Sequence, residues 1–173
     1  MTAEKGSSAG IANFTGIEPR PLHRGWPLHE PTRHFELGCT LDCSGAELAD
    51  FAVREVLGHN RAGWWECDLS DNSLTWTAGV FEIFGVPQNA ALKRDEAVAL
   101  YCEESRAAME RLRSYSIAQQ QSFILDARIK PASGGPERWM RLIGAPVYED
   151  GRPALLHGLK LWLKLRGSPD RGG

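Results

Sequence analysis

Hydrophobic positions change their spacing along the chain, and each change predicts a new element. Over residues 44–57 the apolar side chains of Leu48, Phe51 and Val56 recur at helical spacing. The same stretch opens with SGAE, the spacing at which a serine and a glutamate cap the first turn of a helix. We therefore expect an amphipathic helix over 44–57, which needs a surface to lie against.

From residue 63 onwards the period shortens to two. Trp65 and Cys67 alternate with Trp64 and Glu66, the turn-forming sequence SDNS follows, and the alternation resumes around Trp76. This pattern predicts a β-hairpin that carries Trp65, Cys67 and Trp76 on its inner face.

Helices and then strands are expected after the hairpin. A short helix carries Phe81 and Phe84, and the segment 94–121 is rich in helical pattern. Three strand candidates close the chain, at 123–130, 138–148 and 155–165. Two strands, several helices and three strands predict an α+β fold, in which a five-stranded antiparallel sheet has helices on one face. The helix at 44–57 precedes it.

Alternation within the last predicted strand assigns its side chains to two faces. We place His157 and Leu159 on the inner face, because further leucines share it, and we place Trp162 outward with Lys160. Trp64 also alternates outward, so the two tryptophans predict a protein-binding surface if nothing in the chain covers them. The lysines and arginines of these strands are expected at solvated edges.

Composition and charge narrow the class of protein. The chain has 173 residues, 42% hydrophobic, and a formal charge of -2, which argues against binding nucleic acid by neutralising phosphates. Its four cysteines are sparse, it shows no membrane span and its start lacks a secretion signal, so we expect a cytoplasmic protein. Residues 1–43 mix Gly, Ser, Pro and His, and little structure is expected there or in the tail at 166–173.

Two blocks of the sequence resemble PAS sensory domains. The run GWWECDLS, followed by LTWT and VFEIFGV, is similar to the opening hairpin and first helix of the subgroup that begins Gly-x-Trp-x-x-Asp. FILDAR, GGPERW, GAPV and EDGRP are similar to the last three strands of that subgroup and their turns. The resemblance covers residues 58–165 in the right order, and it implies a PAS fold for this segment.

The resemblance also implies a sensory or signalling role rather than an enzyme. Only eight residues follow Leu165, and WLK at 162–164 stands where the family often carries an Asp-Ile-Thr relay. We therefore expect a stand-alone module that regulates a separate partner by protein contact, such as a sensor kinase or another PAS-containing protein. In many PAS proteins the preceding helix builds a dimer, so 44–57 is expected to form a homodimer.

No cofactor or metal is expected. The stretch CEESR at 102–106 lacks the histidine of the subgroup's His-Pro-x-Asp-Arg pattern, and Cys102 lacks the Asn-Cys-Arg-Phe context of flavin-binding light-oxygen-voltage domains. Haem needs an axial ligand such as histidine, and 103–121 contains none. His157 is the remaining candidate, and a hydrogen-bonded structural histidine is the favoured interpretation. Zinc binding is disfavoured, because the spacing of His29, His34, Cys39 and Cys43 matches no compact zinc-finger pattern.

Two sets of candidate site residues follow from these patterns. The candidates for lining a ligand cavity are Trp65, Cys67, Trp76, Phe81, Phe84, His157 and Leu159. The candidates for an interaction surface are Leu48, Phe51, Val56, Trp64 and Trp162. An aromatic cluster of this kind can either fill its own space or leave a slot for a small apolar ligand. We favour a cluster that fills its own space.

Two other functions remain open at this point. One is a sensor of the same fold whose cavity binds a small molecule or cofactor. The other is a small cavity enzyme of the isomerase or dehydratase type, in which a buried acid would act as base. The strand positions of Asp68 and Asp126 count against the enzyme, because both fall on outward faces.

Overall fold

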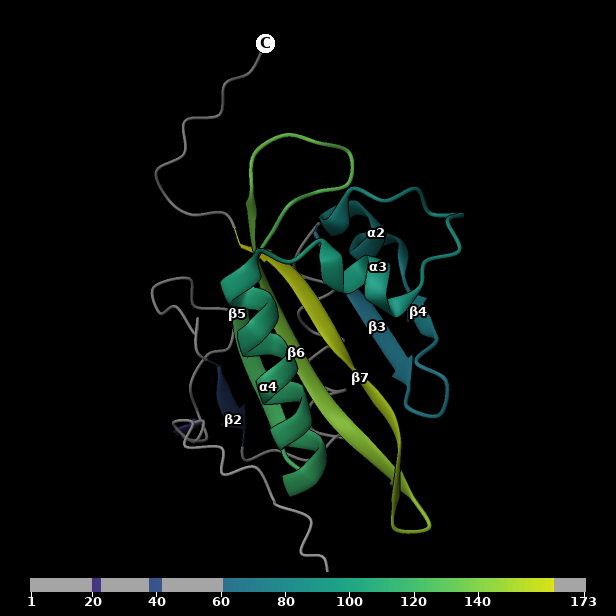
Figure 1. Ribbon diagram of the computed structural model, residues 1–173, viewed down its shortest axis with the longest axis vertical. Coiled ribbons are helices and arrows are strands. Elements are labelled where there is room, and N and C mark those ends of the chain that lie inside the picture. The colour runs from purple at the N-terminus through teal and green to yellow at the C-terminus, as the bar shows by residue number, and fades with distance from the viewer. Residues whose placement is uncertain (1–19, 23–37, 42–60, 164–173) are drawn as a thin grey trace, which may run out of the picture.

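The computed structural model of the chain describes residues 20–22, 38–41 and 61–163. Within these ranges one sheet is covered on one face by three helices (Figure 1). The helices are α2 (Ala78–Phe84), α3 (Arg94–Ala99) and α4 (Glu103–Gln119). The strands are β1 (Arg20–Leu22), β2 (Cys39–Leu41), β3 (Ala62–Asp68), β4 (Leu74–Trp76), β5 (Ser122–Ile129), β6 (Arg138–Glu149) and β7 (Arg152–Leu163). None of these helices is long and apolar enough to cross a membrane.

The strands follow the order β1-β2-β5-β6-β7-β3-β4. The five predicted strands are β3 to β7, and their neighbours all pair antiparallel, so the predicted α+β architecture is confirmed. β1 and β2 extend the sheet beyond β5, in the segment 1–43 where little structure was expected. Three residues each are too few to show a strand period. The predicted helix over 44–57 lies outside the described residues.

The hairpin β3–β4 leads directly into α2. Trp65 pairs with Trp76 across the hairpin, so both side chains share one face, as the alternation predicts. Gly79 lets α2 approach the start of β3, because a Cβ at this position would lie 2.0 Å from the carbonyl oxygen of Ala62. Gly85, with φ of 63°, ends the helix in the left-handed conformation that glycine adopts without strain.

The sheet buries apolar side chains on both faces. On the side that carries the helices, which we call the helix side, the cluster includes Val80, Phe84, Leu112, Leu125 and Met140. On the opposite side, the outer face, a second buried cluster consists of Leu41, Ile124, Ile143, Ala145, Leu159 and Leu161. α2, α3 and α4 all lie on the helix side, so none of these three helices covers the outer cluster (Figure 1).

The pairing of β7 corrects the predicted faces of the last strand. Trp64 lies on the outer face of β3 and pairs with Leu159, and His157 shares that face two residues away. Lys160 and Trp162 lie on the helix side instead. The prediction failed because leucines occupy both faces of β7, and alternation alone then gives no sign of which face is inner.

Candidate functional site

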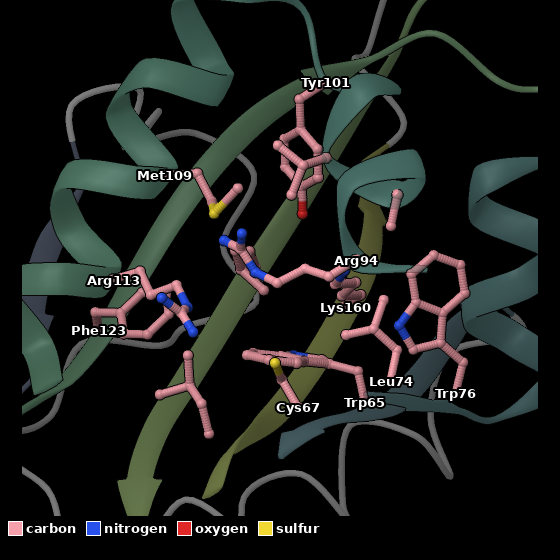
Figure 2. A pocket seen from close by; sticks show the side chains of 14 residues that line it. Trp65, Cys67, Leu74, Trp76, Arg94, Tyr101, Met109, Arg113, Phe123 and Lys160 are labelled. Atoms are coloured by element: carbon pink, nitrogen blue, oxygen red, sulfur yellow. The ribbon is translucent and has the colours of Figure 1, made fainter. Parts of the chain in front are cut away.

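A cavity lies between the helix side of the sheet and the helices α3 and α4 (Figure 2). Its volume is about 50 Å³. Five strands, two helices and the link between the helices contribute the residues that line it, which are Trp65, Cys67, Leu74, Trp76, Arg94, Ala97, Val98, Tyr101, Met109, Arg113, Phe123, Leu142, Leu156 and Lys160. The walls are thus mostly apolar, with a few polar groups among them.

The side chain of Lys160 lies inside this cavity with only 5% of its surface exposed. Its Nζ is 4.5 Å from the ring centroid of Phe84 and 5.0 Å from that of Trp76. The rings of Trp65 and Tyr101 follow at 5.4 and 5.8 Å. Aromatic rings attract a cation at such distances. No carboxylate in the described part of the chain forms an ion pair with this ammonium.

Burial lowers the pKa of Lys160 from its ordinary value near 10.5 to about 7. Loss of hydration is the main cause, because the charged form is the one that burial disfavours. The charge of Cys67 acts in the opposite direction, and the positive charge of Arg94 lowers the pKa further. Lys160 therefore exchanges its proton in the neutral range, where a bound group can change its charge.

Two more hydrogen-bond donors belong to the cavity. Tyr101 is buried, and its hydroxyl points toward the middle of the cavity (Figure 2). Burial raises the pKa of this hydroxyl, so it keeps its proton. The indole Nε1 of Trp76 is buried and has no hydrogen-bond partner among the described residues. An unpaired buried donor costs about 1–3 kcal/mol, which a bound acceptor would recover.

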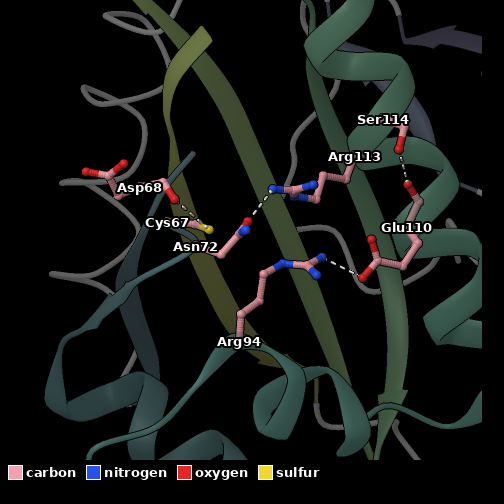
Figure 3. Close-up of polar contacts among 7 residues, drawn as sticks. All are labelled: Cys67, Asp68, Asn72, Arg94, Glu110, Arg113 and Ser114. Carbon is pink, nitrogen blue, oxygen red and sulfur yellow. Dashed lines mark hydrogen bonds and ion pairs between the residues drawn. The ribbon is translucent and has the colours of Figure 1, made fainter. Parts of the chain in front are cut away.

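Two half-buried arginines of the cavity tie α4 to its neighbours (Figure 3). Arg94 of α3 forms an ion pair with Glu110 of α4, with 2.5 Å between Nη2 and Oε1. Arg113 of α4 donates a hydrogen bond to Asn72 Oδ1, in the β3–β4 turn, at 3.2 Å. Because both contacts are partly exposed, each contributes little to the free energy of unfolding. They link α4 to α3 and to the β3–β4 turn beside the cavity.

Several of the predicted cavity residues lie where the sequence predicts them. Those that line the cavity are Trp65, Cys67 and Trp76. Phe84 does not line it, but its ring lies against the ammonium of Lys160 and stacks on Trp76 at 4.8 Å between centroids. Phe81 packs edge-on against Trp76 at 5.4 Å and supports the wall from behind.

His157 and Leu159 do not line the cavity, so this part of the prediction is wrong. Both lie on the outer face, where the imidazole of His157 packs edge-on against Trp64 at 5.1 Å between centroids. Burial lowers the pKa of His157, while the nearby charge of Glu66 raises it. Its Nε2 is buried without a hydrogen-bond partner in the described residues. The imidazole is therefore part of the outer sheet packing and cannot reach a ligand on the helix side.

The residues predicted to form an interaction surface do not all lie on one face. Trp64 lies half-buried on the outer face, as predicted, and its Nε1 donates to Glu66 Oε1 at 3.2 Å. Trp162 lies instead on the helix side, where the guanidinium carbons of Arg61 and Arg138 are 4.3 and 4.2 Å from its ring centroid. An outer surface made by both tryptophans is therefore wrong. The remaining candidates lie outside the described residues: Leu48, Phe51 and Val56.

No three His, Cys, Asp or Glu side chains gather to hold a metal ion within residues 20–22, 38–41 and 61–163. Cys39 lies in β2, and the other proposed zinc candidates lie outside these ranges: His29, His34 and Cys43. Cys102 is buried just before α4, away from the cavity lining, and burial raises the pKa of its thiol.

Sequence reasoning missed the basic residues of the cavity, which are Lys160, Arg94 and Arg113. Lys160 was expected at a solvated edge, and so was Arg141, yet both are buried. A usable signal was present in the sequence, because β7 is a twelve-residue strand that is apolar on both faces. A lysine in the middle of such a strand has no solvated face on which to lie.

The sequence matches no known family profile and no curated protein. It does resemble solved structures. An RNA-binding light-oxygen-voltage receptor matches with a TM-score of 0.53 and 13% identity, over 60% of this chain and 29% of that chain. The N-terminal domain of a diguanylate cyclase with PAS/PAC sensor from Marinobacter aquaeolei matches with a TM-score of 0.53 and 16% identity, over 58% and 94% of the two chains.

A sensory box histidine kinase/response regulator from Burkholderia thailandensis matches with a TM-score of 0.55 and 14% identity, over 64% of this chain and 83% of that one. The chain thus spans less than a third of the receptor but nearly all of the cyclase domain. At these identities the matches show the fold. Together with the strand order and the helices on one face, they establish that residues 61–163 have the PAS fold.

Proposed function

We propose that this chain is a PAS-type sensory signalling module that binds a small molecule in the helix-side cavity and regulates a separate protein by contact. The observation that carries the proposal is the cavity around Lys160. A basic side chain with no ion-pair partner among the described residues is held inside a small apolar space. Such a group is costly to bury for packing alone, because a hydrophobic side chain would fill the same space more favourably. A ligand site accounts for it better than a cavity that fills itself.

Flavin and haem are not part of the proposal. The cavity volume of about 50 Å³ is small beside the several hundred Å³ of pockets that take drug-sized ligands. His157, the remaining haem candidate, lies across the sheet, and Cys102 is not among the lining residues. The residues present do not fit either group.

We propose binding rather than catalysis. Asp68, one of the two acids considered as a base, is exposed at the end of β3 and accepts hydrogen bonds from Ser70. The other, Asp126, lies on the outer face and binds Arg141. Neither acid lines the cavity, so neither supports proton abstraction from a molecule bound there.

We propose the outer face as the route by which the module contacts protein. A second copy of the chain is the first occupant, in line with the homodimer expected through 44–57, and a signalling kinase or another PAS-containing protein is the regulated partner. Trp64 supports this, because it stays partly exposed on the face of the sheet that points away from the three described helices. The cytoplasm is the proposed compartment.

The input half of the proposal is tested with a ligand screen on the full chain. A set of small molecules grouped as anionic, neutral and cationic is added to purified protein, and the midpoint of thermal unfolding is recorded. A ligand at 100 times its Kd stabilises the native state by about 2.7 kcal/mol, which corresponds to a shift of several degrees.

A matched pair of variants on α3 locates the site. Ala97 lines the cavity and Ala99 is exposed on the same helix. Ala97→Leu fills the space and should abolish the shift, whereas Ala99→Leu should preserve it. A screen in which no molecule of any group shifts the midpoint would overturn the proposed input.

A further inference from the structure

We propose that the cavity is a site for a small organic monocarboxylate, held by Lys160 with the indole N–H of Trp76 and the hydroxyl of Tyr101 as further donors. This inference rests on the proposed function, since it names the class of ligand for the same cavity. Four features of the cavity support it: the charge of its lining, its unpaired donors, its size and the apolar character of its walls.

The charge of the lining points to an anion. Of the fourteen lining residues, three are basic and none is acidic, and the basic ones are Arg94, Arg113 and Lys160. Glu110 balances Arg94 from outside the lining, but no described carboxylate balances Lys160. A bound carboxylate would supply the missing charge as a charge-assisted hydrogen bond, which is stronger than a neutral one.

The polar groups inside the cavity can act as donors. Trp76 Nε1 donates only, and it is buried without a partner in the described residues. The hydroxyl of Tyr101 keeps its proton and points into the same space (Figure 2). A protonated Lys160 offers three more N–H bonds. A carboxylate has two oxygens and about four acceptor positions, so it matches this set of donors where a neutral amide or a cation would not.

Size and wall chemistry select the kind of anion. A cavity needs at least 10–15 Å³ for each water-sized group, so about 50 Å³ holds about four of them. Acetate has that size. Apolar side chains of Leu74, Phe123 and Leu142 complete the walls and suit a methyl group better than a further phosphate oxygen. A short-chain monocarboxylate therefore fits better than phosphate, a dicarboxylate or an aromatic acid.

The site also predicts how binding depends on pH. The charged and titratable groups that face Lys160 are Cys67 on β3, Arg94 on α3, Tyr101 after α3 and Arg113 on α4. A carboxylate binds the ammonium form, and the pKa of Lys160 in the free protein is about 7. As the pH rises above 7, each unit should weaken binding about tenfold, until the pKa of the bound state is reached.

The test is a titration of the full chain, uniformly labelled with ¹⁵N, with sodium acetate and separately with acetamide, its neutral isostere. The readout is the indole Nε1–H resonance of Trp76, assigned by its loss in Trp76→Phe. Acetate should move this resonance downfield in a saturable way, and more weakly at pH 8.5 than at pH 6.5. Acetamide should leave it unmoved. Sodium nitrate and sodium phosphate are run as arms that distinguish a carboxylate from other anions.

Lys160→Met and Lys130→Met form the matched pair of variants, because Lys130 is exposed at the end of β5 and lies outside the cavity. We expect Lys160→Met to weaken acetate binding at least tenfold, and Lys130→Met to change it less than twofold. Trp76→Phe keeps an aromatic ring at this position and removes one donor, and should weaken acetate binding several-fold when followed by calorimetry. If Lys160→Met does not fold, the affinity of Trp76→Phe for acetate tests the proposed site instead.

Acetamide binding as well as acetate, or full acetate binding by Lys160→Met, would overturn the inference. Saturable binding of nitrate or phosphate, without binding of acetate, would overturn the assignment of the ligand as a carboxylate. The outcome of the broader screen separates the two proposals. If only neutral or cationic molecules shift the unfolding midpoint, this inference fails and the proposed ligand sensor stands. If no molecule does, the ligand sensor itself fails.

Discussion

Asp126 of β5 and Arg141 of β6 lie directly opposite one another on the outer face of the sheet and form a bidentate ion pair. Arg141 Nε donates to Asp126 Oδ1 at 2.7 Å, and Nη2 donates to Oδ2 at 2.9 Å. The side chains of Asp126 and Arg141 are 0% and 1% exposed, so neither charge is solvated. Each carboxylate or guanidinium buried in this way depends on its partner.

Removing one member of this pair should strongly destabilise the fold. Arg141→Met removes the guanidinium that faces the buried Asp126 carboxylate, and we expect the free energy of unfolding to fall by about 3–5 kcal/mol. Urea unfolding followed by tryptophan fluorescence measures the loss. The double variant Asp126→Leu/Arg141→Met removes both charges and should recover most of it.

Arg128 provides the control for that prediction. It lies two residues from Asp126 on the same strand, and its ion pairs with Glu104 and Glu137 are partly exposed. Arg128→Met should therefore cost less than about 1 kcal/mol. Equal losses for Arg128→Met and Arg141→Met would mean that burial does not set the strength of these ion pairs.

Arg138 joins the end of the sheet to α2, and this contact can be tested separately. Its Nη1 donates to the carbonyl oxygens of Glu82 and Ile83, in the last turn of the helix, at 2.9 and 2.8 Å. Its guanidinium also stacks on Trp162. Arg138→Met removes both hydrogen bonds, and we expect faster hydrogen exchange in α2 together with a loss of about 1–3 kcal/mol.

Arg61 lies on the same tryptophan ring, and it forms no hydrogen bond to α2. Arg61→Met should therefore leave exchange in α2 within twofold of the parent protein. Faster exchange in both variants would show that stacking on Trp162, rather than the bonds to the helix carbonyls, holds α2 in place.

The sequence is sufficient to predict the three helices and the strands β3 to β7, and the reason is visible in particular residues. Trp65 and Cys67 alternate with Trp64 and Glu66, because β3 has one face toward the core and one less buried. Gly85 ends α2 as predicted. β1 and β2 were not predicted, because their pairing makes them strands and their local sequence shows no strand pattern. β2 pairs with β5, and β1 pairs with β2.

The site was predicted only in its aromatic half. Trp65, Cys67 and Trp76 come from a hairpin whose local alternation sets their faces, so the sequence places them correctly. The faces of Lys160 and His157 depend on how β7 pairs with β3, which is separated from it by about 90 residues of chain. With apolar residues on both faces of β7, only the three-dimensional register decides which side chain enters the cavity.

The outer face can be tested as a protein contact through Trp64. Trp64→Glu places a charge beside the buried outer cluster, and we expect it to weaken self-association by about tenfold or more in sedimentation experiments. Thr75→Glu is the control, because Thr75 is exposed and pairs with Glu66 beside Trp64 on the same face. Unchanged association in Trp64→Glu, or equal weakening in both variants, would contradict the proposed contact.

Lys160 should leave a signature in the pH dependence of stability, even with no ligand present. Its pKa is near 10.5 in the unfolded chain and about 7 in the folded protein, so between these values the unfolded state binds more protons. Stability should therefore rise with pH through this window, by on the order of 1 kcal/mol per unit for this group.

Lys160→Met isolates that contribution from other titrations. The variant has no proton to lose at this position, so its advantage over the parent protein should be greatest below pH 7 and should shrink as the pH rises toward 9.5. Urea unfolding of both proteins at several pH values, in buffers free of carboxylates, measures the difference. Every other titratable side chain of the cavity is present in both proteins, so it contributes equally to each. Lys130→Met, at an exposed position outside the cavity, is the matched control for removing a lysine. A gap for Lys160→Met that stays constant from pH 6 to 9.5 would mean that this lysine keeps its proton throughout, held by a partner charge.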